Sequence, residues 1–164
     1  MSDLEFPALV SEEQAWASVK AKAAGFEPEN AALIYHPFAG FVHGMRLPRS
    51  KEESQVHTLV DRLTGKTFIT DPWPKMRQAS QKHAQVQDPR WNSVNFEDAR
   101  LRSRRLVSTA SLRKMKLGHN SKIREIVSYE RIWKPNWLLS GRLGSQKIQV
   151  LVDGMNGGYY VVGC

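Results

Sequence analysis

The sequence predicts an α+β fold with a mostly antiparallel sheet, built from two pseudo-repeated helix plus antiparallel β-hairpin copies that share one core. Three observations lead to this prediction. Helical and strand patterns follow one another in the order helix, strands, helix, strands. The segments 34–69 and 132–161 share aromatic-x-Pro, a loop, Leu-Val-Asp-x-x-[Thr/Asn]-Gly and an apolar run, which is an internal repeat. A chain of 164 residues with 41% hydrophobic residues is long enough to bury one core. We therefore expect a single domain over 1–164.

The first repeat copy, at approximately 10–71, opens with a helix predicted over 12–24. Ser11 is a suitable N-cap, and Gln14, three residues later, completes a capping box. Gly25 supplies the C-terminal stop.

The strands of this copy follow the helix. Residues 33–42 are rich in aromatic and branched side chains and predict a strand, which Pro37 interrupts at an edge or a bulge. Residues 44–54 predict a loop, and 56–60 and 67–70 predict a hairpin.

An aspartate and a glycine recur at the turn of each predicted hairpin. Asp61 and Gly65 occupy the first turn, and Asp153 and Gly157 occupy the second. Because both copies place the aspartate at a turn, we interpret it as a cap of backbone amides rather than a catalytic carboxylate. The Val-Asp-x-x-Thr-Gly hairpin behind a helix resembles small PepSY-type modules, although this turn is shared by many unrelated folds.

A polar linker over 72–94 joins the two copies, and its residues 76–86 fit a weak amphipathic helix. A clearer helix begins at Asn95, a suitable N-cap, and runs toward Gly118. Its predicted buried stripe consists of Phe96, Ala99, Ser103, Leu106, Ala110 and Leu117.

The second repeat copy spans approximately 95–164 and ends in strands. Residues 126–139 predict a long strand with an irregularity at its proline. A turn at 140–146 leads to a hairpin formed by 148–152 and 159–162.

Charge is distributed unevenly along the chain. The formal net charge is +8, but residues 1–74 hold 7 Lys and Arg against 10 Asp and Glu, whereas residues 75–164 hold 17 against 6. Nine basic residues between 100 and 124 have no acidic residue among them, and they are the candidate nucleic-acid-binding set: Arg100, Arg102, Arg104, Arg105, Arg113, Lys114, Lys116, Lys122 and Arg124.

This pattern predicts a non-enzymatic protein that binds the phosphates of DNA or RNA, because phosphate contacts supply most non-specific affinity. Trp73, Trp91 and Trp137 would add base stacking if they are exposed. The alternative is a scaffold subunit that docks through a sheet edge and aromatics such as Trp133, with its basic face on an acidic protein partner. A third interpretation is a helix face that is only solvated.

Catalytic and metal sites are weakly indicated. The sequence lacks the common motifs of hydrolases, zinc proteases and dinucleotide-binding enzymes. His36, His43 and His57 are the remaining candidates for a metal or enzyme site, but an odd separation puts the first two on opposite faces of one strand. We therefore expect no cofactor and no metal.

Targeting signals are likewise not visible. The sequence has one cysteine, no run long enough to span a bilayer and no signal-peptide pattern. These features predict a cytoplasmic protein.

Overall fold

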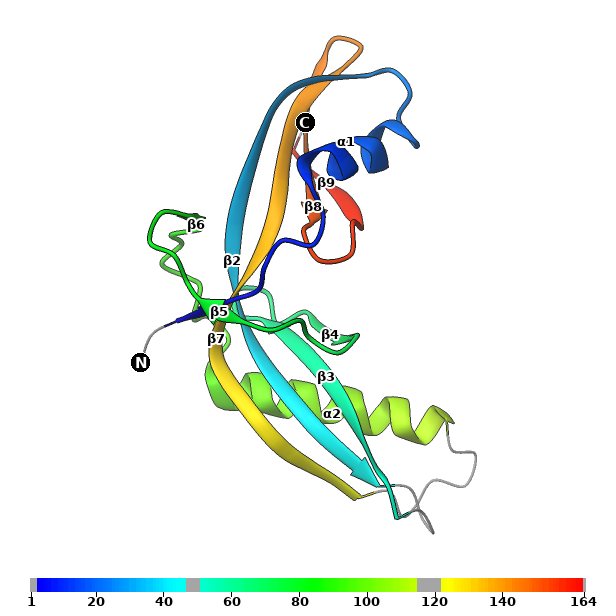
Figure 1. Cartoon of the computed structure of the whole chain (residues 1–164), viewed down its shortest axis with the longest axis vertical. Helices are drawn as coiled ribbons and strands as arrows, with labels where there is room; N and C mark the ends of the chain where they lie inside the picture. Colours follow the sequence, from blue (N-terminus) through cyan, green and yellow to red (C-terminus); the bar gives the residue numbers. More distant parts are fainter. Residues whose placement is uncertain (1–2, 47–50, 115–121, 164) are drawn as a thin grey trace. The chain divides into compact units, whose positions relative to one another are not determined.

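The computed structural model describes residues 3–46, 51–114 and 122–163, which form two helices and nine strands (Figure 1). The elements are β1 (Leu4–Glu5), α1 (Glu12–Lys20), β2 (Phe26–Arg46), β3 (Glu53–Asp61), β4 (Thr67–Thr70), β5 (Arg77–Gln78), β6 (Ala84–Gln85), α2 (Phe96–Lys114), β7 (Lys122–Leu143), β8 (Gln146–Asp153) and β9 (Tyr159–Gly163). The strands pair in the order β4-β3-β2-β7-β1-β5, with β8 on β7 and β9 on β8. Among the described strands, β6 lies parallel to β2, whereas β1 with β5, β2 with β3, β3 with β4, β7 with β8 and β8 with β9 pair antiparallel. The predicted α+β class with a mostly antiparallel sheet is confirmed.

The chain divides into two compact units, each assembled from separate segments. Unit 1 contains 1–36, 75–86 and 133–164, and unit 2 contains 37–74 and 87–132. The units are therefore interleaved along the sequence, whereas the expected repeat copies are contiguous.

Unit 1 is built around the helix α1. Ser11 and Gln14 form the expected capping box, and the helix ends at Lys20, four residues earlier than predicted. Its buried residues Ala15 and Val19 pack in one cluster with Phe26, Leu139, Val150 and Val152. The helix that precedes the first hairpin in the sequence therefore packs on β8, a strand of the second hairpin.

Unit 2 is built around the helix α2, which packs against β3 and β4 (Figure 1). The Oδ1 of Asn95 accepts a hydrogen bond of 2.8 Å from the Asp98 amide, so Asn95 caps the helix as predicted. Ala99 packs in a buried cluster with Ala39, Phe41, Val60 and Val94. The helix continues without a break to Lys114.

The hairpin turns confirm the capping role of the two aspartates. Asp61 Oδ1 accepts from the Leu63 amide at 2.8 Å, and Asp153 Oδ1 accepts from the Met155 amide at 2.7 Å. Gly65 and Gly157 take φ values of 78° and 79°, in the left-handed region that glycine adopts without strain.

Three elements differ from the prediction. The weak helix over 76–86 is wrong, because β5 and β6 lie there and pair with β1 and β2. The two long strands, 26–46 and 122–143, extend well beyond the predicted 33–42 and 126–139. In each case, pairing with strands distant in sequence overrides the local pattern. Neither helix in the described part of the chain is long and apolar enough to cross a membrane.

Candidate nucleic-acid interface

The helix α2 turns small side chains toward the sheet and arginines away from it. Its buried residues recur every four positions at Ala99, Ser103, Val107 and Ser111. The predicted stripe is correct at Ala99 and Ser103, and Phe96 is partly buried. Beyond Ser103 the stripe is displaced by one residue, since Val107 and Ser111 are more buried than Leu106 and Ala110. Leu117 lies outside the described residues.

This rotation separates the candidate arginines onto different flanks of the helix. Arg100 reaches Glu125 on β7, with its Nε 2.8 Å from the carboxylate, and it also pairs with Glu97. Arg102 lies on the other flank, where its Nη1 is 3.5 Å from the Gly65 carbonyl oxygen. The basic residues of α2 therefore do not form a single face.

Two arginines of the candidate set form ion pairs with glutamates, which compensate their charge. The hydrogen bonds that Arg100 donates to Glu97 and Glu125 raise the pKa of Arg100, whose guanidinium also lies over the Phe96 ring. Arg124 forms a two-point ion pair with Glu53, with distances of 2.6 and 2.9 Å. These two arginines are less available to a phosphate than the sequence suggests.

Four members are exposed and form no ion pair with a described residue: Arg102, Arg104, Arg105 and Lys122. A shallow hollow of about 250 Å³ lies on the outer side of α2, lined by Asp98, Leu101, Arg102 and Arg105. The side chains of Arg113 and Lys114, and the whole of Lys116, lie outside the described residues.

The candidate tryptophans already have contacts within the chain. Trp73 lies edge-on to His57 at 5.1 Å between ring centroids, and Trp91 lies beneath the Arg131 guanidinium at 4.6 Å. The indole of Trp137 donates to the Val10 carbonyl oxygen at 2.8 Å. All three are partly buried, so they are not freely available for base stacking. Trp133, expected to contact a protein partner, is buried.

The three candidate histidines occupy separate environments. His36 Nδ1 is 2.9 Å from the Asn136 amide nitrogen, and His43 is buried at 2% exposure. His57 is half-buried, with its ring 5.1 Å from that of Trp73 between centroids. Within the described ranges, no group of three His, Cys, Asp or Glu residues is arranged to hold a metal ion.

His43 belongs to a buried polar cluster that the sequence did not reveal. Its Nε2 is 2.7 Å from the Ser103 hydroxyl of α2, which also hydrogen-bonds to Thr58 of β3. Its Nδ1 has no hydrogen-bond partner among the described atoms. Ser103 in the middle of the predicted helix could have indicated this cluster, because a buried hydroxyl requires a hydrogen-bond partner.

We expect the stability of the protein to fall as the pH drops from 7.5 to 5. Burial lowers the pKa of His43, with Glu125 opposing and Arg104 adding to this effect. The unfolded histidine, titrating near 6.5, then binds the proton more tightly than the folded one. The contribution of His43 to the free energy of unfolding is therefore full above pH 6.5 and is lost as the pH falls toward the pKa of the folded state. The loss amounts to about 1.4 kcal/mol for each unit by which folding lowers the pKa.

Urea unfolding of wild type and His43→Gln at both pH values measures this effect. The variant should show a smaller loss, because glutamine keeps a polar contact to Ser103 without titrating. Equal losses in the two proteins would contradict the assignment to His43.

Arg62 is the largest fully buried side chain of the described residues, and no sequence pattern singled it out. Its Nε donates to the Val94 carbonyl oxygen at 2.7 Å, its Nη1 donates to the Glu130 carbonyl oxygen at 2.8 Å, and its Nη2 bonds Asn92. The second hairpin has Gly154 at the corresponding position, so a comparison of the two copies carried a signal.

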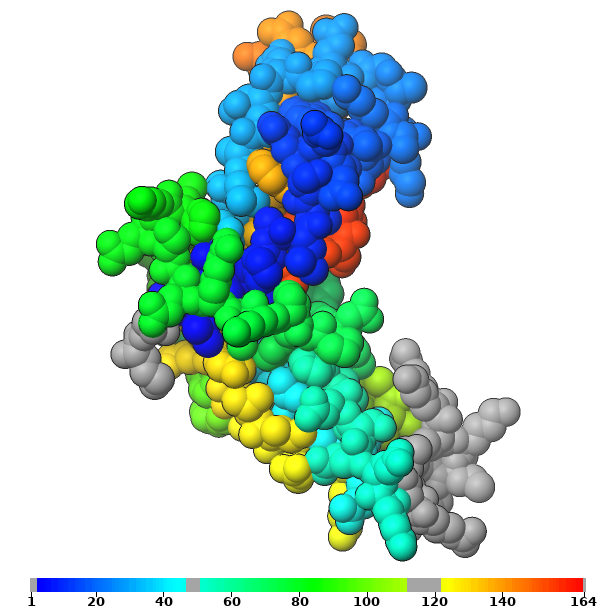
Figure 2. Space-filling model, viewed as in Figure 1, coloured from blue at the N-terminus to red at the C-terminus, as the bar shows by residue number. Residues whose placement is uncertain are grey.

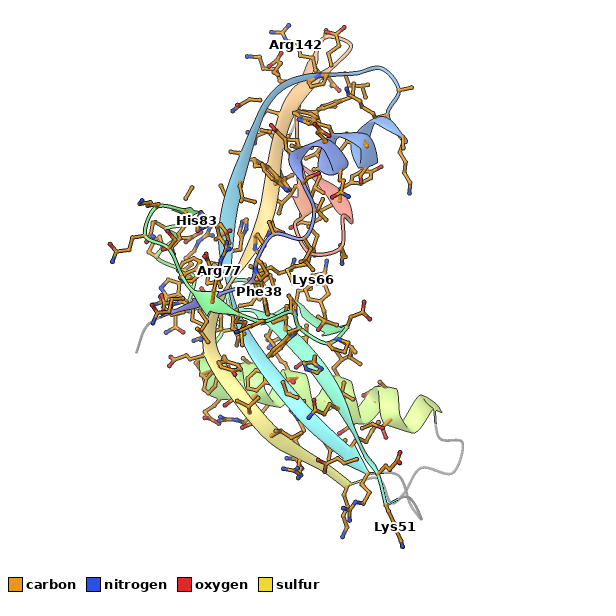
Figure 3. All side chains as sticks on the ribbon, viewed as in Figure 1. Phe38, Lys51, Lys66, Arg77, His83 and Arg142 are labelled. Carbon is orange, nitrogen blue, oxygen red and sulfur yellow. The ribbon has the colours of Figure 1, made fainter. Side chains whose placement is uncertain are left out.

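A polar cluster in unit 1 was also missed. Glu5 is buried and pairs with Arg77 at 2.9 Å and with His83 at 3.4 Å (Figure 3). The Tyr35 ring packs on His83, and burial together with the Glu5 charge raises the pKa of Tyr35. These contacts attach the 75–86 segment to β1 and β2.

Within the part of the chain that the structure describes, the exposed basic side chains of this region that form no ion pair are Arg102, Arg104, Arg105 and Lys122. Exposed guanidinium and ammonium groups offer multiple donors to an anion. Comparison of this chain with protein-family models, with curated proteins and with solved structures finds no match.

Proposed function

We propose that this chain is a cytoplasmic, non-enzymatic protein that binds nucleic-acid phosphates through α2 and the start of β7. One observation carries the proposal: positive charge is concentrated in unit 2. This unit holds 16 Lys and Arg against 9 Asp and Glu, whereas unit 1 holds 8 against 7. Such a concentration attracts a polyanion and makes its affinity dependent on salt.

The geometry of α2 supports the proposal. A helix of 19 residues is about 28 Å long, enough to lie along several phosphates. Arg104 and Arg105 extend from it into solvent, and Lys122 begins the strand that follows. Guanidinium groups suit phosphates because they donate two parallel hydrogen bonds.

Replacing these three exposed cations together, in Arg104→Gln/Arg105→Gln/Lys122→Gln, should weaken binding to mixed-sequence DNA and RNA oligonucleotides. On duplex DNA, we expect the slope of log affinity against log salt to fall by about 0.9 for each phosphate that the variant no longer neutralises. Fluorescence anisotropy at several salt concentrations measures both quantities.

The matched control removes the same charge from unit 1, in Lys20→Gln/Lys22→Gln/Lys147→Gln. It should leave both the affinity and the slope unchanged. Absence of binding by the wild type at about 50 mM salt would reject the proposal, because phosphate contacts strengthen as salt falls.

A second candidate function is that of a protein-interaction subunit. Two strands that each pair with one described neighbour, β4 with β3 and β9 with β8, expose apolar side chains: Phe68, Ile69, Tyr160, Val161 and Val162. The C-terminal strand, red in Figure 2, reaches the molecular surface. Exposed edges of this kind are suited to strand addition. Light scattering and co-purification from the native host distinguish this function from nucleic-acid binding.

We also propose that the two hairpins are copies of one ancestral unit. Their registers correspond, since Phe38 lies opposite Asp61 and Asn136 lies opposite Asp153, each directly after a proline. The turns correspond as well: the Lys66 amide donates to the Thr64 hydroxyl, and the Gly158 amide donates to the Asn156 side chain.

Thr64→Asn should therefore leave the free energy of unfolding within about 0.5 kcal/mol of wild type, the range of an uneventful surface change. Asparagine supplies the same acceptor at this position of the other turn. Thr64→Ala removes that acceptor and should be destabilising by about 0.5–1.5 kcal/mol. Urea denaturation ranks the variants, and an asparagine as costly as alanine would argue against equivalent turns.

A further inference from the structure

The strand β4 has an open edge that can accept another strand. It pairs with β3 alone, in an uninterrupted register from His57–Thr70 to Val60–Thr67. The Asp61 amide donates a hydrogen bond to the Lys66 carbonyl oxygen, so these two residues form a hydrogen-bonded pair. Non-hydrogen-bonded and hydrogen-bonded pairs alternate from there along β3 and β4. Thr67 and Ile69 therefore turn their backbone N–H and C=O groups toward the open edge.

The face of β4 that points toward α2 is basic. Ile69 lies opposite Thr58, whose hydroxyl bonds Ser103 of α2, so Ile69 shares the face that the helix covers. Arg102 extends over the β3–β4 turn, where its Nη1 is 3.5 Å from the Gly65 carbonyl oxygen. A strand added to β4 would pass near this guanidinium.

The opposite face of β4 is apolar at its centre. Phe68 points there and is 39% exposed, and the Lys66 ammonium lies 5.4 Å from its ring centroid. Figure 3 labels Lys66 at the start of this strand. A peptide that binds along this edge would therefore need side chains of two kinds at alternate positions.

We propose that the open edge of β4 binds an extended peptide in which acidic and apolar residues alternate. Main-chain hydrogen bonds to Thr67 and Ile69 would provide affinity, as in other cases of strand addition. Because side chains alternate across a strand, acidic residues would lie on the face that carries Arg102 while apolar residues cover Phe68. This proposal deepens the second candidate function and does not depend on nucleic-acid binding.

Charge distinguishes this partner from a second copy of the chain. A symmetric pair of β4 strands would place only threonine and isoleucine on the face that carries Arg102, leaving its charge unmatched. An acidic peptide pairs with this arginine and also with the net positive charge of unit 2.

The probe for this site is a fluorescein-labelled (Glu-Val)4 peptide, with its ends blocked, titrated with the intact protein at low salt. We expect saturable binding, at least tenfold weaker binding of (Lys-Val)4, and loss of binding when every glutamate of the peptide is N-methylated. Hydrogen exchange should show the amides of Thr67 and Ile69 slowed at least tenfold in the complex.

Arg102→Glu should reverse the preference, so that (Lys-Val)4 binds more tightly than (Glu-Val)4. The matched control, Arg104→Glu, changes the same charge on the other flank of α2 and should leave the peptide preference intact while weakening oligonucleotide binding. Binding without protection of Thr67 and Ile69, equal binding of the N-methylated peptide, or no binding at millimolar peptide would each overturn the proposal. If the protein binds oligonucleotides but any of these results is obtained with the peptides, only the peptide proposal is rejected.

Discussion

Replacing Arg62 with methionine should lower the free energy of unfolding by about 3–5 kcal/mol, because three acceptors would each lose the donor that Arg62 supplies. The guanidinium connects three separate segments of unit 2, through the carbonyls of Val94 and Glu130 and the side chain of Asn92. Methionine would fill much of the volume but would leave these acceptors without a donor. Each buried group left unpaired costs about 1–3 kcal/mol.

Urea denaturation measures the effect, with Arg90→Met as the matched control. Arg90 is exposed and pairs only with Asp88 in the same loop, so its replacement should change stability little. Arg62→Lys should be intermediate, because lysine keeps the charge but not the fork of donors. A methionine variant as stable as wild type would show that Arg62 does not hold these segments together.

Gly141→Ala should also be strongly destabilising, by about 1–3 kcal/mol or more, the cost of overpacking a filled core. A Cβ at this position of β7 would contact the Glu27 carbonyl oxygen and lie 2.5 Å from Cζ of Phe26. The carbonyl is part of the backbone of β2, and the phenylalanine belongs to the core of unit 1. Neither group can move away without disturbing the sheet or the core.

Gly25→Ala provides the control within the same unit. Its Cβ would meet only the Leu143 Cδ1, at the ordinary contact distance of 3.6 Å. Thermal or urea unfolding should place this variant near wild type, with Gly141→Ala well below it. Equal stability of the two variants would mean that the backbone between β2 and β7 can relax at Gly141.

The features that the sequence predicted correctly depend on residues close together in the chain. The capping box at Ser11 and Gln14, the cap at Asn95 and the aspartate turns at Asp61 and Asp153 depend on residues within four positions of one another. Each appears in the structure where it was predicted, because its hydrogen bonds are made before any tertiary contact is needed.

The features that the sequence did not predict depend on contacts between residues far apart in the chain. Residues 76–86 have a helical pattern, yet β1 and β2 draw them into short strands through pairing and through Glu5 and Tyr35. The arginines of α2 look alike in the sequence, but Arg100 is compensated by Glu125 while Arg104 is not. Only the register of β7 against the helix decides which of them remains available, and that register is a tertiary property.

The interleaving of the two units has a consequence for synthesis on the ribosome. The helix α1 emerges early, but the strand β8 against which it packs begins about 125 residues later, a delay of about 6–25 s at ordinary translation rates. The apolar face of α1, with Ala15 and Val19, therefore has Phe26 nearby but lacks its partners Leu139, Val150 and Val152 in the nascent chain during that interval. Unit 2, complete by residue 132, can fold first, and unit 1 can close only when the final hairpin leaves the exit tunnel.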